Sequence, residues 1–70
     1  MTLNQCHIKA SEINGRVGFP RVVLNSYRKG EYRVYDNFEY VEDEFDRVSD
    51  VNDRLNEILR EIDERLLFKE

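Results

Sequence analysis

The sequence predicts an α+β protein, with a three-stranded antiparallel β-meander over residues 1–36 followed by one long amphipathic helix over residues 37–69. Three observations support this fold class. Apolar and polar residues alternate in the first half of the chain, two hairpin-type turn sequences divide that half, and apolar residues recur in steps of three and four through the second half. The 70 residues suffice for one domain, and a chain of that size needs very good packing or a partner to be stable.

The first strand is predicted within residues 3–13. Its alternating apolar positions are Cys6, Ile8 and Ala10. Asn14-Gly15 follows, a dipeptide typical of two-residue hairpin turns because both residue types tolerate positive φ. Residues 16–27 form the second predicted strand. Pro20 belongs at an edge, a bulge or the start of that strand, since proline donates no backbone hydrogen bond.

A second hairpin is predicted at Arg28-Lys29-Gly30, with Gly30 in the left-handed position of a three-residue loop. Residues 31–36 form the third strand. The two turns imply conflicting side-chain registers, which a bulge near Pro20 would reconcile, because one extra residue moves the following side chains to the opposite face. The sequence leaves this choice open.

The second half of the chain predicts a helix. Asp36 is a favourable N-cap, and Glu39 completes a capping-box pattern with it. One continuous helix from about Asn37 to Phe68 is the simplest interpretation, since no Gly or Pro follows Gly30. The alternative is a break at Ser49-Asp50, where either residue could cap a second helix.

A heptad pattern runs along this predicted helix. Its a positions are Phe38, Phe45, Asn52, Leu59 and Leu66, and its d positions are Val41, Val48, Leu55 and Ile62. A helix of about 31 residues is roughly 45 Å long, whereas strands of five to eight residues reach only roughly 17–26 Å. The sheet cannot cover the whole apolar stripe, so the sequence predicts a homodimer or higher oligomer formed through the helix. The predicted interface residues are Phe45, Val48, Asn52, Leu55, Leu59, Ile62 and Leu66.

Asn52 is the polar exception in that pattern. One interpretation pairs it with the equivalent Asn52 across a dimer, where a buried amide fixes register and strand number at a cost in stability. The other places it at a helix break or facing water. The sequence does not decide between them.

Charge divides the chain. Residues 1–35 hold six basic and two acidic residues, whereas residues 36–70 hold five basic and thirteen acidic residues. The basic residues near the second hairpin alternate with tyrosines, a combination that can hold phosphates and stack bases. The candidate contact residues are Arg21, Tyr27, Arg28, Lys29 and Arg33. The sequence pI of about 5.0 argues against nucleic acid, whose partners usually carry a basic domain.

Catalytic and metal-binding chemistry has little support in the sequence. Cys6 and His7 are adjacent, so on a strand they would point to opposite faces, and no second Cys or His provides a metal-ligand spacing. We therefore predict a protein that is not an enzyme and needs no cofactor. One cysteine, the absence of a membrane-length apolar run and an N-terminus unlike a secretory signal predict a cytoplasmic location.

These observations favour a small homo-oligomeric binding or inhibitory protein that acts on a larger macromolecular partner. The size also fits a modulator encoded by a phage or mobile element. The alternative prediction is a protein that binds nucleic acid or a phosphorylated small molecule through the Arg/Tyr hairpin at a subunit interface.

Overall fold

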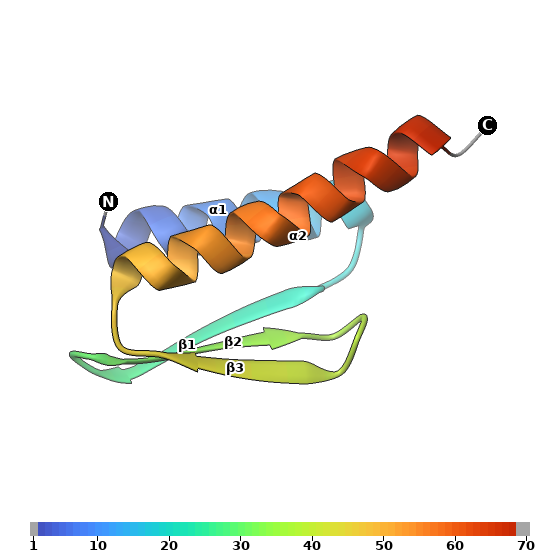
Figure 1. Cartoon of the computed structure of the whole chain (residues 1–70). Helices are drawn as coiled ribbons and strands as arrows, with labels where there is room; N and C mark the ends of the chain where they lie inside the picture. Colours follow the sequence, from blue (N-terminus) through green and yellow to red (C-terminus); the bar gives the residue numbers. More distant parts are fainter. Residues whose placement is uncertain (1, 69–70) are drawn as a thin grey trace.

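The chain folds in the order helix, three strands, helix (Figure 1). The structure is a computed structural model that describes residues 2–68. The elements are α1 (Leu3–Val17), β1 (Val22–Arg28), β2 (Glu31–Asp36), β3 (Val41–Phe45) and α2 (Val48–Phe68). Both helices lie side by side on one face of the sheet (Figure 1). The α+β class, the three-stranded antiparallel sheet and the C-terminal helix are confirmed, and α1 is an addition that the sequence analysis did not predict.

The N-terminal segment is a helix, so the predicted strand within residues 3–13 is wrong. A capping box starts this helix: the Thr2 hydroxyl accepts a hydrogen bond from the Gln5 amide at 3.2 Å, and Gln5 Oε1 accepts one from the Thr2 amide at 2.8 Å. This reciprocal arrangement satisfies two amides that the first turn of a helix leaves without partners. The predicted turn at Asn14-Gly15 is also wrong, because both residues lie within α1. The helix ends at Gly18, whose φ of 76° suits a residue without a side chain.

The burial pattern of α1 explains the error. The buried residues are Cys6, Ala10 and Ile13, which share one face at helical spacing. Ile8 completed the false alternation, and its side chain is 54% exposed.

The sheet has the strand order β1-β2-β3, and both pairs are antiparallel. The predicted hairpin is confirmed, with Gly30 at a φ of 83°, but its turn has two residues, Lys29-Gly30, and not three, because Arg28 belongs to β1 and pairs with Glu31. The register shifts between Ser26 and Arg28, so the irregularity lies beside this hairpin and not near Pro20. The second predicted strand, residues 16–27, began too early, because β1 starts at Val22.

The helix predicted from Asn37 begins at Val48 instead, one residue before the alternative break at Ser49-Asp50. Residues 37–40 form a turn and residues 41–45 form β3. The predicted helix N-cap at Asp36 is therefore wrong: Asp36 caps the Phe38 and Glu39 amides of a turn, where the chain reverses so that β3 pairs with β2. The predicted boundaries of the meander, 1–36, and of the helix, 37–69, are therefore wrong, and Lys69 lies outside the described residues.

The core lies between the sheet and the two helices. α1 contributes Cys6, Ala10 and Ile13; the sheet contributes Val22, Leu24, Tyr32 and Val34; α2 contributes Val51, Leu55, Ile58 and Ile62. At about 1.5 Å per residue, the 15 residues of α1 are roughly 22 Å long and the 21 residues of α2 roughly 31 Å. The sequence predicted that a second copy of the chain covers the apolar stripe of the C-terminal helix, but α1 of the same chain supplies most of that cover.

Polar contacts hold the two helices together at the border of this core. Lys9 Nζ donates hydrogen bonds to Asn52 Oδ1 at 2.6 Å and to Asn56 Oδ1 at 2.8 Å. Asn52 therefore has a partner within its own chain. Neither sequence-based interpretation of that residue anticipated this role.

Candidate interaction surface

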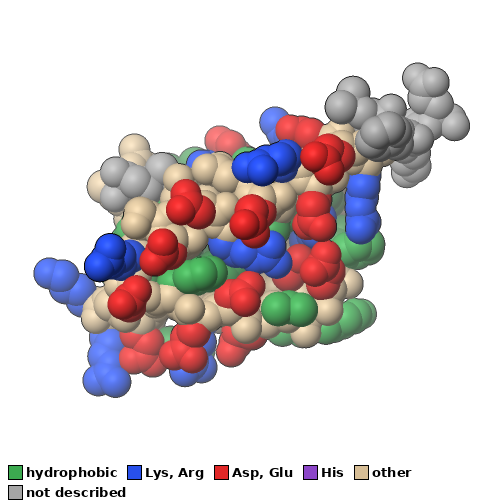
Figure 2. Space-filling view, in the orientation of Figure 1, with side chains coloured by type: hydrophobic (Ala, Val, Ile, Leu, Met, Phe, Trp, Pro, Cys, Tyr) green, Lys and Arg blue, Asp and Glu red, His purple; other side chains and the backbone are tan. Residues whose placement is uncertain are grey.

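Exposed apolar side chains gather at the end of the sheet that carries the turn between β2 and β3. Figure 2 shows hydrophobic side chains at that end of the molecule, beside the acidic residues that cover much of this view. Four large residues make up this surface, which we call the turn-end patch: Phe19 (41% exposed), Phe38 (45%), Tyr40 (78%) and Val41 (41%). Concentrated apolar exposure on a small protein is a feature of contact surfaces, whereas single exposed apolar residues are ordinary.

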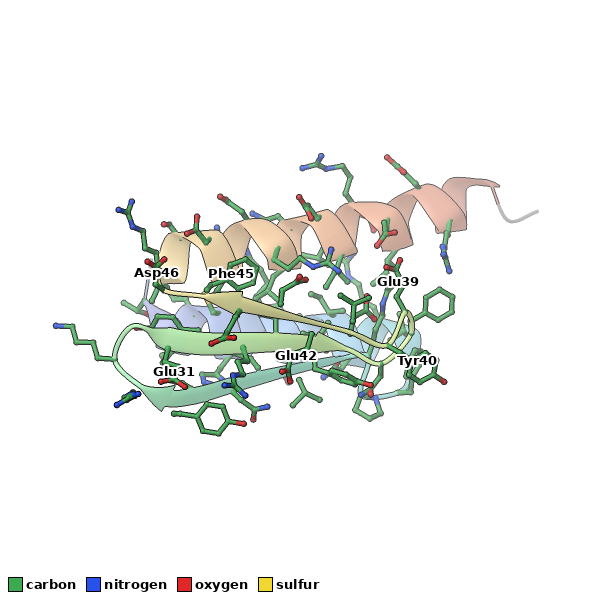
Figure 3. The ribbon with its side chains drawn as sticks, turned by 60° about the horizontal axis from the view of Figure 1, so that its bottom comes forward. Glu31, Glu39, Tyr40, Glu42, Phe45 and Asp46 are labelled. Atoms are coloured by element: carbon green, nitrogen blue, oxygen red, sulfur yellow. The ribbon has the colours of Figure 1, made fainter. Side chains whose placement is uncertain are left out.

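Hydrogen bonds tie the two segments of the patch together. Asn37 Nδ2 donates to the Pro20 carbonyl at 2.5 Å, and the Asn37 amide donates to the Arg21 carbonyl at 2.7 Å. The segment that enters β1, with Phe19, is thereby fixed beside the turn that carries Phe38 and Tyr40. Figure 3 places Glu39 and Tyr40 at this end of the sheet, opposite Glu31 and Asp46.

A buried carboxylate holds the turn. Asp36, 1% exposed, accepts hydrogen bonds through Oδ1 from the Phe38 amide at 2.8 Å and from the Glu39 amide at 3.4 Å. Burial alone would raise the pKa of Asp36, but the hydrogen bonds from Arg21 and from the Phe38 amide outweigh burial and hold that pKa below its usual value. The carboxylate therefore stays ionised and caps the turn.

Arg21 neutralises Asp36 and links the turn to α2. The Arg21 guanidinium, 3% exposed, donates to both Asp36 oxygens at 3.3 and 3.4 Å and to Glu61 Oε2 at 3.3 Å. Arg54 Nη2 lies 3.8 Å from Asp36 Oδ2, and Arg54 Nε donates to Asp43 at 3.1 Å. These contacts join the residue just before β1 to β2, β3 and α2, so the turn is held by the body of the protein.

The cations also support the aromatic surface. The Arg21 guanidinium carbon lies 5.0 Å from the centroid of the Phe38 ring, and that of Arg65 lies 4.4 Å from it. Distances of this size give favourable cation–π contacts. Phe38 is thereby held in place although nearly half of it is exposed.

Tyr40 has a φ of 59°, the left-handed region that residues with a Cβ rarely adopt. Its amide donates to the Asp36 carbonyl at 2.8 Å, which closes the turn in this conformation. A glycine would relieve the strain of about 1–2 kcal/mol. The chain instead places here the large apolar side chain that is most exposed among those the structure describes.

The open face of the sheet is charged. The Arg33 guanidinium lies 3.7 Å from Glu31, 4.0 Å from Glu42 and 3.9 Å from Glu44. Arg28 donates to Glu31 at 2.7 Å, and this hydrogen bond is the main reason that the pKa of Glu31 lies below its usual value. The two cations are thus outnumbered by the three carboxylates.

The structure separates the predicted hairpin contacts. Tyr27, Arg28 and Lys29 are exposed around the hairpin between β1 and β2, and the ring centroid of Tyr27 lies 5.1 Å from the Arg33 guanidinium carbon. Arg21 does not join them, because it is buried in the ion network at the other end of the sheet. Arg28 and Arg33 already contact carboxylates, which reduces the positive charge available to a phosphate.

The predicted oligomer interface is also divided. Leu55 is fully buried and Ile62 is 6% exposed within the single chain, so neither is available to a second copy in this fold. Phe45, Val48, Asn52 and Leu59 are partly exposed. The side chain of Leu66 is not among those that the structure describes.

Cys6 and His7 do not form a reactive pair. Cys6 is fully buried on α1, and burial raises the pKa of its thiol, which leaves it protonated and unreactive. His7 is exposed on the same helix. Across residues 2–68, no cluster of three or more His, Cys, Asp or Glu side chains is arranged to hold a metal ion, and no helix in that range has the length and apolarity to cross a membrane.

No protein-family model, curated protein or solved structure matches this chain. The geometry must therefore carry the functional argument. Sequence reasoning missed the turn-end patch because it assigned Phe38 and Val41 to the apolar stripe of a helix. The signal that could have located the turn was Asp36 itself, because an aspartate side chain that accepts hydrogen bonds from the amides two and three residues later fits a chain reversal as well as a helix start.

Proposed function

We propose that this protein is a small non-enzymatic binding protein that acts on a larger macromolecular partner through the turn-end patch. The observation that carries the proposal is the exposure of four large apolar side chains at the end of the sheet where buried Asp36 fixes the turn between β2 and β3. A surface that is already ordered loses little conformational entropy when a partner docks, which favours binding. Blocking a surface of the partner would make such binding inhibitory.

Tyr40 supports this proposal most directly. A strained residue persists where the surrounding structure enforces it, and strain of this kind concentrates at functional positions. Since the Tyr40 side chain is 78% exposed, packing within the chain does not account for the choice of a tyrosine there. Aromatic residues of this type are enriched among the residues that dominate protein interfaces.

The test exploits that strain. Tyr40→Gly removes the ring and relieves the backbone, so we expect a variant that is more stable by about 1 kcal/mol and yet loses the partner. Ile8→Ser is the matched control, since it removes another exposed apolar side chain from α1. Immobilised wild type and each variant are incubated with lysate of the native host, and bound proteins are quantified by mass spectrometry.

The proposal predicts a protein retained by wild type and Ile8→Ser and lost with Tyr40→Gly. An identical set of bound proteins for all three would contradict it. Because Tyr40→Gly is expected to be the more stable variant, unfolding cannot explain a loss of binding, and thermal denaturation of each variant verifies this.

Self-association through α2 stays a prediction, with Val48, Asn52 and Leu59 as its remaining candidate contacts among the described side chains. Binding of nucleic acid or a phosphorylated molecule at the hairpin between β1 and β2 also stays a prediction. The pairing of Arg28 and Arg33 with carboxylates gives it less support than the turn-end patch gives to a protein partner. A shallow dependence of any binding on salt would argue against nucleic acid, whose counterion release makes that dependence steep.

A further inference from the structure

The hydrogen-bond pattern of the sheet fixes which peptide groups of β3 face outward. In an antiparallel pair, opposed residues alternate between bonded pairs and pairs whose N–H and C=O groups point away from one another. The Asn37 amide donates to the Arg21 carbonyl, so this hydrogen bond joins the residue after Asp36 to the residue before its opposed partner, Val22. Val22 and Asp36 are therefore a non-bonded pair, and the peptide groups of Asp36 face β3.

Alternation then settles the other edge. The residues of β2 that bond to β3 are Asp36, Val34 and Tyr32, opposite Val41, Asp43 and Phe45. The peptide groups of Glu42 and Glu44 consequently point away from the sheet. We call these two outward peptide groups the β3 edge.

The opposite edge of the sheet is partly closed. Asn14 of α1 bonds to both outward groups of Val22: its Oδ1 accepts from the Val22 amide at 2.8 Å, and its Nδ2 donates to the Val22 carbonyl at 3.0 Å. The Asn14 side chain thus takes the place of a neighbouring strand. Leu24 is the next residue of β1 whose peptide groups point away from β2, and it is only 9% exposed. Among the described residues, no element lies beyond β3 in the sheet order.

The side chains beside the β3 edge define the chemistry of an incoming strand. Glu42 and Glu44 lie on the open face with side chains 49% and 67% exposed. They share Arg33 at 4.0 and 3.9 Å, the outer range of an ion pair, so much of their charge is unneutralised. A strand bonded at Glu42 and Glu44 places its own side chains directly across from both carboxylates, where opposite charges stabilise the pairing.

A second copy of β3 does not fit this edge. Antiparallel pairing of two VEDEF segments would set acidic residues across from acidic residues, which is destabilising. Charge on an edge strand protects a sheet from such self-pairing. The same charge leaves the edge open to a strand of opposite sign.

We propose that the β3 edge is a strand-addition site for an extended cationic segment of another protein, with Lys or Arg at two alternate positions across from Glu42 and Glu44. The segment runs antiparallel to β3, so its first cation lies across from Glu44 and its second cation, two residues later, lies across from Glu42. The residue after the second cation lies beside exposed Val41 and is apolar. The bound segment extends the sheet to four strands. This site shares Val41 with the turn-end patch but does not use Tyr40, so the proposal does not depend on the binding proposed for Tyr40.

The test uses synthetic peptides. A short blocked fluorescent peptide that alternates lysine and valine is titrated with the intact protein and followed by fluorescence anisotropy at low and physiological salt. We expect saturable binding, and no binding of the matched peptide that alternates glutamate and valine. N-methylation of the lysines removes the amides that face β3 and is expected to abolish binding, whereas N-methylation of the valines is expected to leave it unchanged.

Variants of the protein complete the test. Glu42→Lys combined with Glu44→Lys is expected to weaken the lysine peptide about tenfold or more and to bind the glutamate peptide instead. Glu12→Lys combined with Glu64→Lys makes the same change in net charge at exposed positions on the two helices and is expected to bind like wild type. Tyr40→Gly is likewise expected to retain the lysine peptide, so failure of this site is distinguishable from failure of the turn-end patch.

Amide hydrogen exchange measures the ladder itself. On addition of the lysine peptide, the amides of Glu42 and Glu44 are expected to slow together, whereas that of Asp43, already bonded to β2, is expected to change little. Equal binding of both N-methylated peptides, or equal loss with both double charge variants, would show simple charge attraction and overturn the proposal. So would a lysine peptide that does not bind at low salt.

Discussion

The buried charge network makes Asp36→Ala the most informative substitution in this fold. The change removes a carboxylate that receives two hydrogen bonds from Arg21 at 3.3 and 3.4 Å and two from turn amides at 2.8 and 3.4 Å. It leaves the Arg21 guanidinium buried, with Glu61 as its remaining hydrogen-bonded carboxylate. Breaking a buried ion pair from one side costs about 3–5 kcal/mol, because the other charge stays buried and loses compensation.

That loss is large for this chain. At about 0.05–0.15 kcal/mol per residue, 70 residues correspond to an unfolding free energy of roughly 4–10 kcal/mol. We therefore expect Asp36→Ala to lose about half of the stability or to unfold. Urea denaturation at neutral pH, followed by far-UV circular dichroism, measures the change.

Two further substitutions separate the causes. Asp36→Asn loses the charge but retains an oxygen at the place of Oδ1, which accepts from both the Phe38 amide and Arg21 Nε, so its difference from Asp36→Ala measures these hydrogen bonds apart from the charge, at about 1–3 kcal/mol. Asp63→Ala breaks the exposed Arg16–Asp63 pair, 2.9 Å long, and is expected to cost less than about 1 kcal/mol. The reasoning would be refuted if Asp36→Ala and Asp63→Ala had similar unfolding free energies.

The remaining predictions concern pH, the sheet edge and the helix interface. Because the folded-state pKa of Asp36 lies below its ordinary value near 3.8, the contribution of its carboxylate to the unfolding free energy is present above pH 3.8 and is lost as the pH falls through the folded-state pKa. The urea midpoint of wild type is therefore expected to fall more steeply in acid than that of Asp36→Asn. Asn14→Ala leaves two part-buried groups of Val22 without partners and is expected to cost about 1–3 kcal/mol, with faster exchange of the Val22 amide; an unchanged exchange rate would argue against the bridge. Asn52→Leu removes one of two acceptors of Lys9, so we expect a change below about 1 kcal/mol and an unchanged mass in sedimentation, whereas a more stable assembly of mixed size would support oligomerisation through α2.

Local signals predicted the middle of the chain well. The hairpin that contains Gly30 is confirmed because a glycine at positive φ dictates the turn whatever packs around it. The alternation in residues 31–36 is likewise confirmed as β2, whose burial alternates along the strand. Such features depend on a few neighbouring residues and so can be read from sequence.

The predicted first strand and the start of the predicted long helix failed for a different reason. In each, the apolar spacing fits two periods. Cys6, Ile8 and Ala10 alternate as in a strand, yet Cys6 and Ala10 are also four apart as in a helix, and Thr2 with Gln5 supplied the capping box that distinguishes the two. Val41 and Phe45 are four apart as well, but there the strand is correct. Short apolar patterns of this kind are decided by tertiary packing.

The turn-end patch could not be predicted, because exposure depends on which elements meet. Phe38 and Val41 had the same apolar character as residues now in the core, and only the reversal of the chain at Asp36 brings them to the surface. The buried role of Arg21 was hidden for the same reason: its partners Asp36 and Glu61 are distant in sequence. Charged residues in a strand-rich segment are usually solvated, so the sequence favoured a surface role.

The error at the N-terminus also produced the predicted need for a second copy of the chain. An apolar stripe on a helix indicates that another element packs against it, but it does not tell whether that element belongs to the same chain or to a second copy. Once residues 3–17 form a helix, Cys6, Ala10 and Ile13 join the core with Leu55 and Ile62, and the central part of the stripe is closed within one chain. Among the α2 side chains that the structure describes, the apolar ones left to a dimer are the partly exposed Val48 and Leu59, where less apolar area is left to bury and the expected stabilisation is correspondingly smaller.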